Sequence, residues 1–468
     1  MIILVSVPRL NPMSQSALFK LSQNIEQDGL TCNIYNANLD LYDKFYNTEY
    51  WNDLETWGIQ NNSLEGKLKA IVEMMSRKWA KEILAKNPTH IGISVFTHES
   101  RGWTEYLCKH LKKLSPDTII ILGGAGLNTP GIPYAEFGKK CLEDNLCDAY
   151  FNGEAEQELL KYIKNESCIV NNEEPLTCSL NYNYQNQDHP HIDTDWYIYD
   201  NDSTTISETN VYIAESTRGC VKRCTFCDVP LIRNYKFDIK NPNDLIEELK
   251  KAIDSGKNKI QFTDSMINGS NSSFIIWLEK LANHLEKNNI CDFFWKGQYG
   301  FKSIKNTPNE VFDLLSRTNA HLNIGMDHLS DNVLKHMRKQ YTYEDIIWNL
   351  ENTKNKISNC IFVIGYPTET IKDFELLKSR FKEVQQYDCV KCWDFGTTCS
   401  VPVGSELSKL PGIETQENQI KWYWPGNPTL TLDERIRRRK EIEQIAIEND
   451  LTIRKQRTQW KRIEKWID

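Results

Sequence analysis

The stretch that decides how this chain folds is Thr217-Arg-Gly-Cys220-Val-Lys-Arg-Cys224-Thr-Phe-Cys227-Asp-Val-Pro230. Its cysteines, Cys220, Cys224 and Cys227, follow the spacing C-x3-C-x2-C. Three thiolates at this spacing on one loop can each bind one iron of a cubane cluster. Three ligands for four irons leave one iron open, and an open coordination position is what a substrate-binding metal centre requires. The stretch therefore predicts a [4Fe–4S] cluster on these cysteines.

A structural zinc site and chance are the alternatives to a cluster. Zinc normally takes four Cys or His ligands in a closed site. The next cysteine downstream is Cys291, and the upstream His189 and His191 lie outside the usual zinc spacings. Because no fourth ligand stands nearby in the sequence, the pattern favours the cluster.

Three neighbours of the cysteines have expected roles. Gly219 is expected to let the backbone approach the cluster, because glycine has no side chain in the way. Lys222 and Arg223 are expected to place positive charge beside an anionic assembly and help to retain it.

Residues 206–410 alternate strands with helices around this stretch. The predicted strands are Val211–Glu215, Lys259–Thr263, Phe293–Tyr299, His321–Gly325, Cys360–Gly365 and Lys391–Gly396. Helices are predicted between them at about 242–255, 272–288, 308–317, 343–356 and 369–385. Six strand–helix units predict an open, partial (β/α)6 barrel. In such barrels the site lies at the C-terminal ends of the strands.

The cysteine spacing, with the aromatic Phe226 before the last cysteine, resembles the radical S-adenosylmethionine (SAM) superfamily. Three further segments follow the loop in the family's order, although each alone also fits ordinary barrel architecture: Phe262-Thr-Asp264, Ile324–Thr342 and Phe362–Thr370. The resemblance implies that Phe226 is a cofactor-binding residue and that SAM binds the open iron. One electron from the cluster then cleaves SAM to methionine and a 5′-deoxyadenosyl radical.

The resemblance implies further cofactor-binding residues, position by position. Asp264 matches an acidic position near SAM. Asp327 stands where the family usually has Glu, so a side chain one methylene shorter would have to bind the ribose. Gly365 and Pro367 would shape the loop after the fifth strand, and Glu369 would fall in the first turn of the next helix.

Two features near the end of the barrel depart from the family pattern or add to it. The segment Pro402-Val-Gly404-Ser-Glu-Leu407 resembles the family's closing segment but differs at two positions. Cys389 and Cys392 form a C-x2-C pair, and Cys399 follows. An auxiliary cluster is one interpretation; buried thiols beside a barrel strand are the favoured one.

Residues 1–165 alternate short apolar runs with amphipathic segments. The predicted strands are Ile2–Val7, Thr31–Tyr35, His90–Phe96 and Thr118–Leu122, and the predicted helices are Ser14–Leu30, Leu64–Leu84 and Trp103–Leu114. Apolar strands that alternate with helices indicate a parallel sheet with helices on both sides.

The order of features in this region resembles the cobalamin (B12)-binding domain that precedes the barrel in one large radical SAM class. The matching parts are Gly92–His98, Leu122–Gly126 and Phe151–Glu156. The resemblance implies cobalamin as a cofactor. A flat ligand or its nucleotide tail would lie against the sheet edge at the cofactor-binding glycines Gly123, Gly124 and Gly126.

One cobalamin feature is missing from the sequence. None of the nine histidines sits in the Asp-x-His-x-x-Gly motif that supplies a cobalt ligand in other cobalamin proteins. Many members of this radical SAM class also lack the motif, so its absence does not exclude the cofactor. The alternative is a Rossmann-like domain that has lost the cofactor and shapes the substrate entrance.

The predicted fold class is α/β. A Rossmann-like (flavodoxin-like, B12-binding type) domain spans 1–165, a connecting segment 166–205, a partial radical SAM barrel 206–410, and a C-terminal helical extension 411–468. From Arg435 onward, 11 basic residues outnumber 6 acidic ones, and a solvated helix is the expected form of this tail.

Composition narrows the classes of function. The chain has 468 residues, is 40% hydrophobic and 26% charged, and has a net charge of −8. This charge argues against broad nucleic-acid binding. No apolar run approaches the roughly 18–20 residues that span a bilayer, and the N-terminus lacks the pattern of a signal peptide. We therefore expect a cytoplasmic protein whose cysteines are reduced or bind metal.

These observations predict a radical SAM enzyme, with cobalamin-dependent methylation of an unactivated carbon as its reaction. The alternatives are a radical SAM cyclisation, rearrangement or sulfur insertion without cobalamin, and a non-catalytic cluster or zinc protein. The resemblance implies an external reductant such as flavodoxin or ferredoxin and a small-molecule substrate. The sequence does not identify that substrate.

Overall fold

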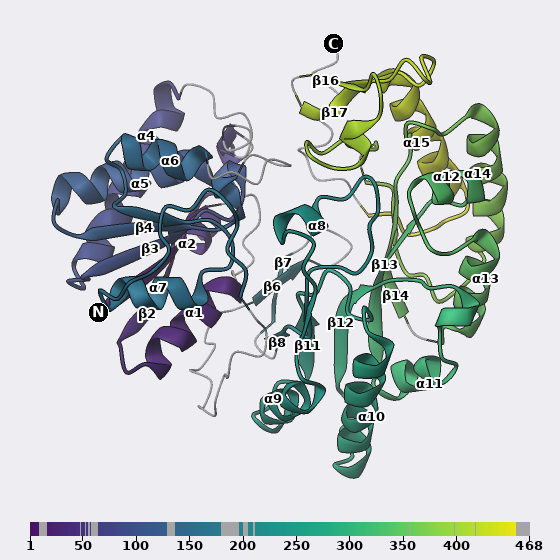
Figure 1. Ribbon diagram of the computed structural model, residues 1–468, viewed down its shortest axis with the longest axis horizontal. Helices are drawn as coiled ribbons and strands as arrows, with labels where there is room; N and C mark the ends of the chain where they lie inside the picture. The colour runs from purple at the N-terminus through teal and green to yellow at the C-terminus, as the bar shows by residue number, and fades with distance from the viewer. Residues whose placement is uncertain are drawn as a thin grey trace. The chain divides into compact units, whose positions relative to one another are not determined.

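A computed structural model describes the chain except residues 9–15, 47, 52, 55–56, 58–63, 129–135, 179–195, 200–204, 209–210, 355, 397, 417 and 455–468. The described chain forms two compact units, unit 1 within Met1–Ile198 and unit 2 within Tyr199–Gln456 (Figure 1). Much of the predicted connecting segment lies outside the described residues. Its described part includes two paired strands, β6 (Trp196–Tyr199) and β7 (Thr205–Glu208). The predicted domain boundaries stay predictions.

Unit 1 contains a parallel sheet of five strands. These are β1 (Ile2–Ser6), β2 (Cys32–Asn36), β3 (His90–Ser94), β4 (Ile119–Gly123) and β5 (Ala149–Phe151), in the order β2-β1-β3-β4-β5. Every neighbouring pair is parallel. This is the flavodoxin-like order, in which ligands bind outside the carboxyl ends of the strands. The predicted doubly wound domain is confirmed.

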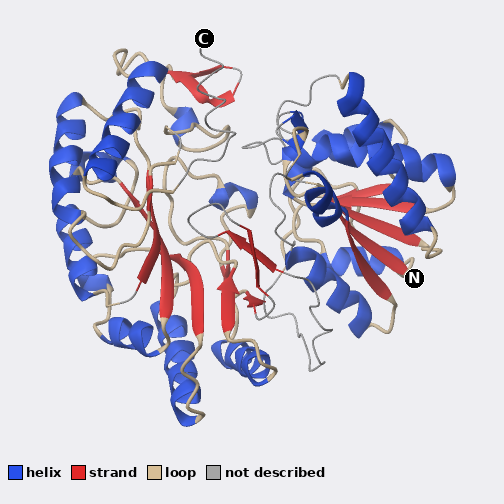
Figure 2. Ribbon diagram, turned by 180° about the vertical axis from the view of Figure 1, so that it is seen from behind, coloured by secondary structure: helices blue, strands red, loops and turns tan. Residues whose placement is uncertain are grey.

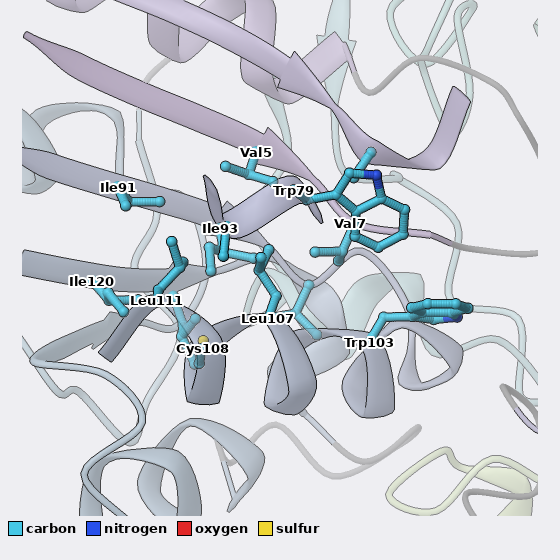
Figure 3. Packing of buried hydrophobic residues seen from close by; sticks show 14 of the residues in the cluster. Val5, Val7, Trp79, Ile91, Ile93, Trp103, Leu107, Cys108, Leu111 and Ile120 are labelled. Atoms are coloured by element: carbon cyan, nitrogen blue, oxygen red, sulfur yellow. The ribbon is translucent and has the colours of Figure 1, made fainter. Parts of the chain in front are cut away.

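Helices cover both faces of this sheet because successive strand residues point to opposite sides. One core contains Ile3 and Val5, and the other contains Ile2 and Leu4. The first core takes side chains from α2 (Ala37–Phe45), α4 (Gly66–Leu84), α5 (Arg101–Leu114) and α6 (Glu136–Glu143); the second takes them from α1 (Ser16–Gln27) and α7 (Glu156–Ile163). Figure 3 shows Leu107 of α5 among the strand residues of the first core.

Unit 2 contains a parallel sheet whose strands pair in chain order. They are β8 (Val211–Ala214), β11 (Lys259–Phe262), β12 (Phe294–Tyr299), β13 (Ala320–Asp327), β14 (Lys356–Phe362) and β15 (Trp393–Asp394). The two outer strands, β8 and β15, do not pair with each other, so the barrel stays open. The predicted partial barrel is confirmed, with strand ends shifted by a few residues.

Helices connect these strands on the outer side of the sheet (Figure 2). They are α9 (Pro242–Asp254), α10 (Asn271–Lys287), α11 (Glu310–Arg317), α12 (Asp331–His336), α13 (Tyr343–Asn352) and α14 (Ile371–Val384). Among the helices that the structure describes, none combines the length and apolar character needed to cross a bilayer.

The sequence predicted a helical C-terminal extension, but the extension is only partly helical. It begins with an antiparallel hairpin of β16 (Glu414–Gln416) and β17 (Asn418–Tyr423), and then forms α15 (Leu432–Glu448). The expectation of a solvated helix is wrong for α15, because Arg435, Arg438 and Arg439 are buried. The 14 residues that follow Arg454 lie outside the described part of the chain.

Two leucines of α5 test the packing of unit 1. Leu107 is fully buried, whereas Leu114 on the last turn is 46% exposed. Leu107→Ala should lower the free energy of unfolding by about 2–5 kcal/mol, because it removes buried methyl groups and leaves a cavity. Leu114→Ala should change it by about 0.5 kcal/mol or less. Chemical denaturation followed by tryptophan fluorescence measures both; equal effects would contradict this packing.

Candidate functional site

The three cysteines lie on the loop that follows β8. Short strands β9 (Thr217–Arg218) and β10 (Asp238–Ile239) pair at its base, and helix α8 (Val229–Ile232) follows it. The thiols of Cys220, Cys224 and Cys227 are half-buried. Burial raises the pKa of Cys227 to about 12, and negative charge on the other two thiols adds to the shift. A bound metal would therefore have to stabilise the thiolate form of Cys227.

The arrangement of these thiols is compatible with a cluster. Within the described residues, no three His, Cys, Asp or Glu side chains lie close enough together to hold one metal ion. A cubane does not require such convergence, because each thiolate binds a different iron. The Lys222 backbone N–H donates to Cys220 Sγ at 3.4 Å, a bond of the kind that tunes iron–sulfur clusters.

Contacts within the loop give two neighbours of the cysteines a structural role beside the one expected from the sequence, and that expected role stays a prediction. Gly219 has a φ of 90°, and an added Cβ would lie 2.3 Å from the Lys236 carbonyl oxygen. Glycine is thus required by the close approach of the backbone at Lys236, just before β10. Arg223 donates to the carbonyl oxygens of Cys220 (3.2 Å) and Tyr235 (3.0 Å), so its guanidinium ties the loop together.

Asp264 follows β11 and anchors the start of the cysteine loop. Its buried carboxylate accepts hydrogen bonds from the backbone N–H groups of Ser216 and Thr217. It also accepts hydrogen bonds from their hydroxyls, with Asp264 Oδ1 at 2.5 Å from Ser216 Oγ and 2.7 Å from Thr217 Oγ1. Burial raises the pKa of Asp264 to about 6, against the effect of these bonds. The predicted contact of Asp264 with SAM stays a prediction, whereas its contacts in the protein hold the turn before Cys220.

Asp327 ends β13 with a left-handed φ of 63°. Its buried carboxylate forms an ion pair with Lys339 and accepts a hydrogen bond from the Tyr341 hydroxyl at 3.2 Å. Burial opposes the charge on Lys339, but Asp327 holds the pKa of this amine above its usual value. The amine also lies 5.3 Å from the centre of the Phe226 ring. Asp327 thus reaches the cysteine loop through Lys339, and its predicted ribose contact stays a prediction.

Three amines gather around the cysteine loop, and the sequence had singled out Lys222 alone. Burial, together with the nearby positive charge of Lys339, lowers the pKa of Lys222. In the same way, burial and the positive charge of Lys222 lower the pKa of Lys302 to about 8. Lys302 donates to Asn271 Oδ1 at 2.5 Å. Among the described residues no carboxylate forms an ion pair with Lys222 or Lys302. The resulting positive potential suits an anionic cluster and the carboxylate of SAM.

The loop after β14 differs in part from the prediction. Helix α14 begins at Ile371 with Thr370 as its N-cap, so Glu369 precedes the helix instead of lying in its first turn. The Glu369 carboxylate turns back and accepts the Gly365 backbone N–H at 2.7 Å. Pro367 is buried, and its carbonyl oxygen accepts a hydrogen bond from Asn427 at 3.1 Å. The loop is therefore held mainly by contacts within the protein.

The structure brings the predicted residues of unit 2 to one edge. Asp264, Asp327 and Gly365 follow the ends of β11, β13 and β14, and parallel strands place these ends on the side where the cysteine loop follows β8. The hydroxyls of Tyr366 and Thr225 lie 2.8 Å apart and join the loop after β14 to the cysteine loop.

The later cysteines lie in or beside the core of unit 2. Cys392 and Cys399 are buried and Cys389 is half-buried. Cys399 packs in a hydrophobic cluster with Tyr366. Buried thiols remain the favoured interpretation. In the closing segment, the Leu407 backbone N–H donates to the Thr225 carbonyl oxygen at 2.8 Å.

In unit 1 the predicted glycines have different roles. A Cβ on Gly124 would lie 2.6 Å from the Val95 carbonyl oxygen, and one on Gly126 would lie 2.4 Å from that of Thr97. These two glycines therefore allow the loops after β3 and β4 to pack together, and their predicted contact with a ligand stays a prediction. Gly123 has no such neighbour, since the nearest atom would be 3.9 Å away.

Several buried polar atoms at the same edge of unit 1 have no hydrogen-bond partner among the described residues. They belong to the last residue of β1 and to the loops and helix start after β3 and β4: Ser6 Oγ, Ser100 Oγ, Arg101 Nη2 and Asn128 Oδ1. Arg101 also donates from Nε to the Gly126 carbonyl oxygen at 2.8 Å. Unpaired buried polar groups are costly, so this edge fits a ligand that carries hydrogen-bonding groups, as the nucleotide tail of cobalamin does.

Comparison with known proteins identifies the central part of unit 2. Residues 214–380 match the family model of the radical SAM superfamily. A curated relative, tRNA-2-methylthio-N(6)-dimethylallyladenosine synthase of Hydrogenobaculum sp. (strain Y04AAS1), is 30% identical over 190 residues. The match covers 37% of this chain and 41% of the relative, so the chain spans less than half the length of that protein.

Solved structures match both units of the chain. One is the radical S-adenosylmethionine methyltransferase TsrM from Kitasatospora setae with cobalamin and a [4Fe–4S] cluster bound, at a TM-score of 0.63 and 14% identity, covering 90% of this chain and 78% of that one. Another is the cobalamin-dependent SAM radical enzyme OxsB, at a TM-score of 0.57 and 13% identity, covering 87% and 60%. At such identities the likeness shows the fold, and it confirms the predicted fold class.

The cluster assignment predicts a clear loss in one variant. The reconstituted protein should hold about four irons, as one cubane requires. Changing Cys220, Cys224 and Cys227 together to Ala should abolish bound iron and the thiolate–iron absorption near ~400 nm. Cys291→Ala is the control, because this thiol is exposed and lies elsewhere in the unit. Iron analysis and visible spectra measure the effect; a triple variant that keeps its iron would show the assignment to be wrong.

The glycines of unit 1 supply a matched pair of substitutions. Gly126→Ala should lower the free energy of unfolding by about 1–3 kcal/mol, because its Cβ has no room beside the Thr97 carbonyl. Gly123→Ala should have a smaller effect, because its Cβ would make only an ordinary contact. Thermal unfolding of the two variants side by side measures the difference. If Gly123→Ala were the more damaging, the packing described for these loops would be incorrect.

Proposed function

We propose, from the premise that residues 214–380 are a radical SAM domain, that this chain is a cobalamin-dependent radical SAM methyltransferase acting on an unactivated carbon of a small molecule. The observation that carries the proposal is the fold likeness to TsrM over 90% of the chain, which extends over both units. A radical SAM domain implies a [4Fe–4S] cluster, SAM and an external reductant such as flavodoxin or ferredoxin. The substrate is not identified.

In unit 2 we assign some residues to cluster binding and others to support of the cysteine loop. Cys220, Cys224 and Cys227 would hold the cluster. When bound, the cluster and SAM supply a 5′-deoxyadenosyl radical, and cobalamin supplies a methyl group. Asp264 fixes the turn before the cysteines, and the ion pair of Asp327 with Lys339 supports the loop from the other side. The cluster site is thereby held in place by buried hydrogen bonds and charges.

Unit 1 supports the cobalamin part of the proposal. Its strand order and the unpaired polar atoms at the carboxyl edge of its sheet suit a cofactor with a polar nucleotide tail. Gly123 leaves space at the end of β4. Since the Asp-x-His-x-x-Gly motif is absent, we propose that no histidine of unit 1 ligates the cobalt, and that contacts around the corrin and its tail provide the affinity.

A second candidate function is sulfur insertion by radical SAM chemistry without cobalamin. The observation that favours it is the 30% identity to a methylthio-forming enzyme, which exceeds the identity to the cobalamin-binding structures. That match covers only 41% of the relative. It therefore supports a shared cluster and SAM chemistry better than it supports transfer of the same chemical group. Cobalamin binding separates the two candidates.

The proposal predicts tight binding of cobalamin by the apo protein. Titration with hydroxocobalamin should change the visible spectrum with a stoichiometry near one, and the cofactor should stay with the protein on a desalting column. Arg101→Met should weaken this binding, because it removes a buried guanidinium from the carboxyl edge of unit 1. The control is Lys113→Met, at the far end of α5. If the wild-type protein does not bind cobalamin at micromolar concentration, sulfur insertion becomes the better candidate.

A further inference from the structure

Helix α15 buries a basic face in unit 2. Arg435 and Arg438 have exposures of 0% and 3%, although the helix is rich in charge. The neighbouring Arg437 points outward, with a side chain that is 52% exposed and paired with Glu434 and Glu441. Residues three apart share one face of a helix, so the buried arginines form a single contact surface. The helix lies beside α14, where Lys378 pairs with Glu441 (Figure 1).

Arg438 binds the fully buried Glu369 on the loop after β14. Its Nη1 donates to Glu369 Oε1 at 2.8 Å and to the Glu369 carbonyl oxygen at 3.2 Å. The other carboxylate oxygen, Oε2, accepts the Gly365 N–H and lies 3.4 Å from His328 Nε2. Burial opposes the charge of Glu369, but His328 and Arg438 hold its pKa below the usual value. The carboxylate is therefore held by Arg438 on one oxygen and by the Gly365 N–H on the other.

Arg435 fixes the same loop from a second position. The stem of Arg435 lies against Gly365, where an added Cβ would meet Arg435 Cγ at 2.6 Å. Its guanidinium lies 3.8 Å from the centre of the Trp422 ring and donates to the carbonyl oxygens of Cys399 (3.3 Å) and Trp422 (3.2 Å). Gly365 is thus enclosed between its own loop and α15, which explains why glycine stands there.

The loop that α15 holds is connected to the cysteines by two routes. Tyr366, next to Gly365, shares a hydrogen bond with Thr225, which follows Cys224 directly. The Ser330 N–H donates to His328 Nδ1 at 2.9 Å, and Nε2 of the same ring lies 3.4 Å from Glu369 Oε2. The residue before His328 is Asp327, whose partner Lys339 lies beside the cysteine loop. A shift at Glu369 would therefore be transmitted toward the cysteines along both routes.

We infer that Arg438 is a positioning residue for the SAM site, and that α15 belongs to this site although none of its described contacts involves Cys220, Cys224 or Cys227. Arg438 acts through Glu369, which sets the backbone of Gly365 and Tyr366 at the strand end beside the cysteine loop. The inference rests on the proposed radical SAM function. It extends the site to a segment outside residues 214–380, the part of the chain that matches the family model.

The test compares two adjacent arginines in the reconstituted full-length protein. Arg438→Met should raise the dissociation constant for SAM by roughly 10-fold, as changes in residues that support a metal site commonly do. It should also weaken the change that SAM produces in the electron paramagnetic resonance (EPR) spectrum of the reduced cluster. Arg437→Met should change neither quantity. Arg438→Lys should recover part of the affinity, because its amine keeps the charge near Glu369 but lacks the planar fork.

Removing one partner of a buried ion pair can prevent folding, so a second variant is needed. The double variant Glu369→Gln with Arg438→Met removes both charges and should fold, yet it should still bind SAM weakly, because the tie to α15 is absent. If either variant folds with full iron and shows the wild-type SAM affinity and EPR response, the inference is overturned. A wild-type protein that holds no iron or does not bind SAM would instead contradict the proposed function.

Discussion

Parallel pairing of the strands in chain order is the constraint on which the cluster site depends. Because β8, β11, β12, β13 and β14 are neighbours and run the same way, every loop that leaves their carboxyl ends emerges at one edge. Residues as distant in sequence as Cys220 and Gly365 thereby become parts of one site. The same rule operates in unit 1, where the loops after β1, β3 and β4 gather the unpaired polar atoms. In each unit the candidate site residues thus lie at the carboxyl edge of a parallel sheet.

Buried carboxylates hold the site of unit 2 together. Asp264 is bound by the backbone and hydroxyls of Ser216 and Thr217, Asp327 by Lys339, and Glu369 by Arg438. Each carboxylate is compensated, which is what allows it to remain buried. The amines of Lys222 and Lys302 form no ion pair within the described chain. Fixed positive charge is therefore available where an anionic cluster and the SAM carboxylate would bind.

Much of this site could be predicted from local patterns in the sequence. The cysteine loop is a continuous motif, and the strands are apolar runs between helices, so both are visible without a structure. The burial of Arg438 could not be predicted from the sequence, because its partner Glu369 lies 69 residues away and a run of arginines usually faces water. Likewise Gly124 and Gly126 were rightly marked as special, but only the structure shows that Val95 and Thr97 occupy the space for their side chains. Lys302 belongs to no motif, and it reaches the site through the position of β12.

The most direct test of the radical SAM assignment is to measure 5′-deoxyadenosine after the reconstituted protein is mixed with SAM and a strong reductant without oxygen. The proposed function predicts 5′-deoxyadenosine and methionine in equal amounts, formed by the wild-type protein and not by the variant that lacks Cys220, Cys224 and Cys227. A protein that carries its full iron content, binds SAM and still forms no 5′-deoxyadenosine would contradict the assignment.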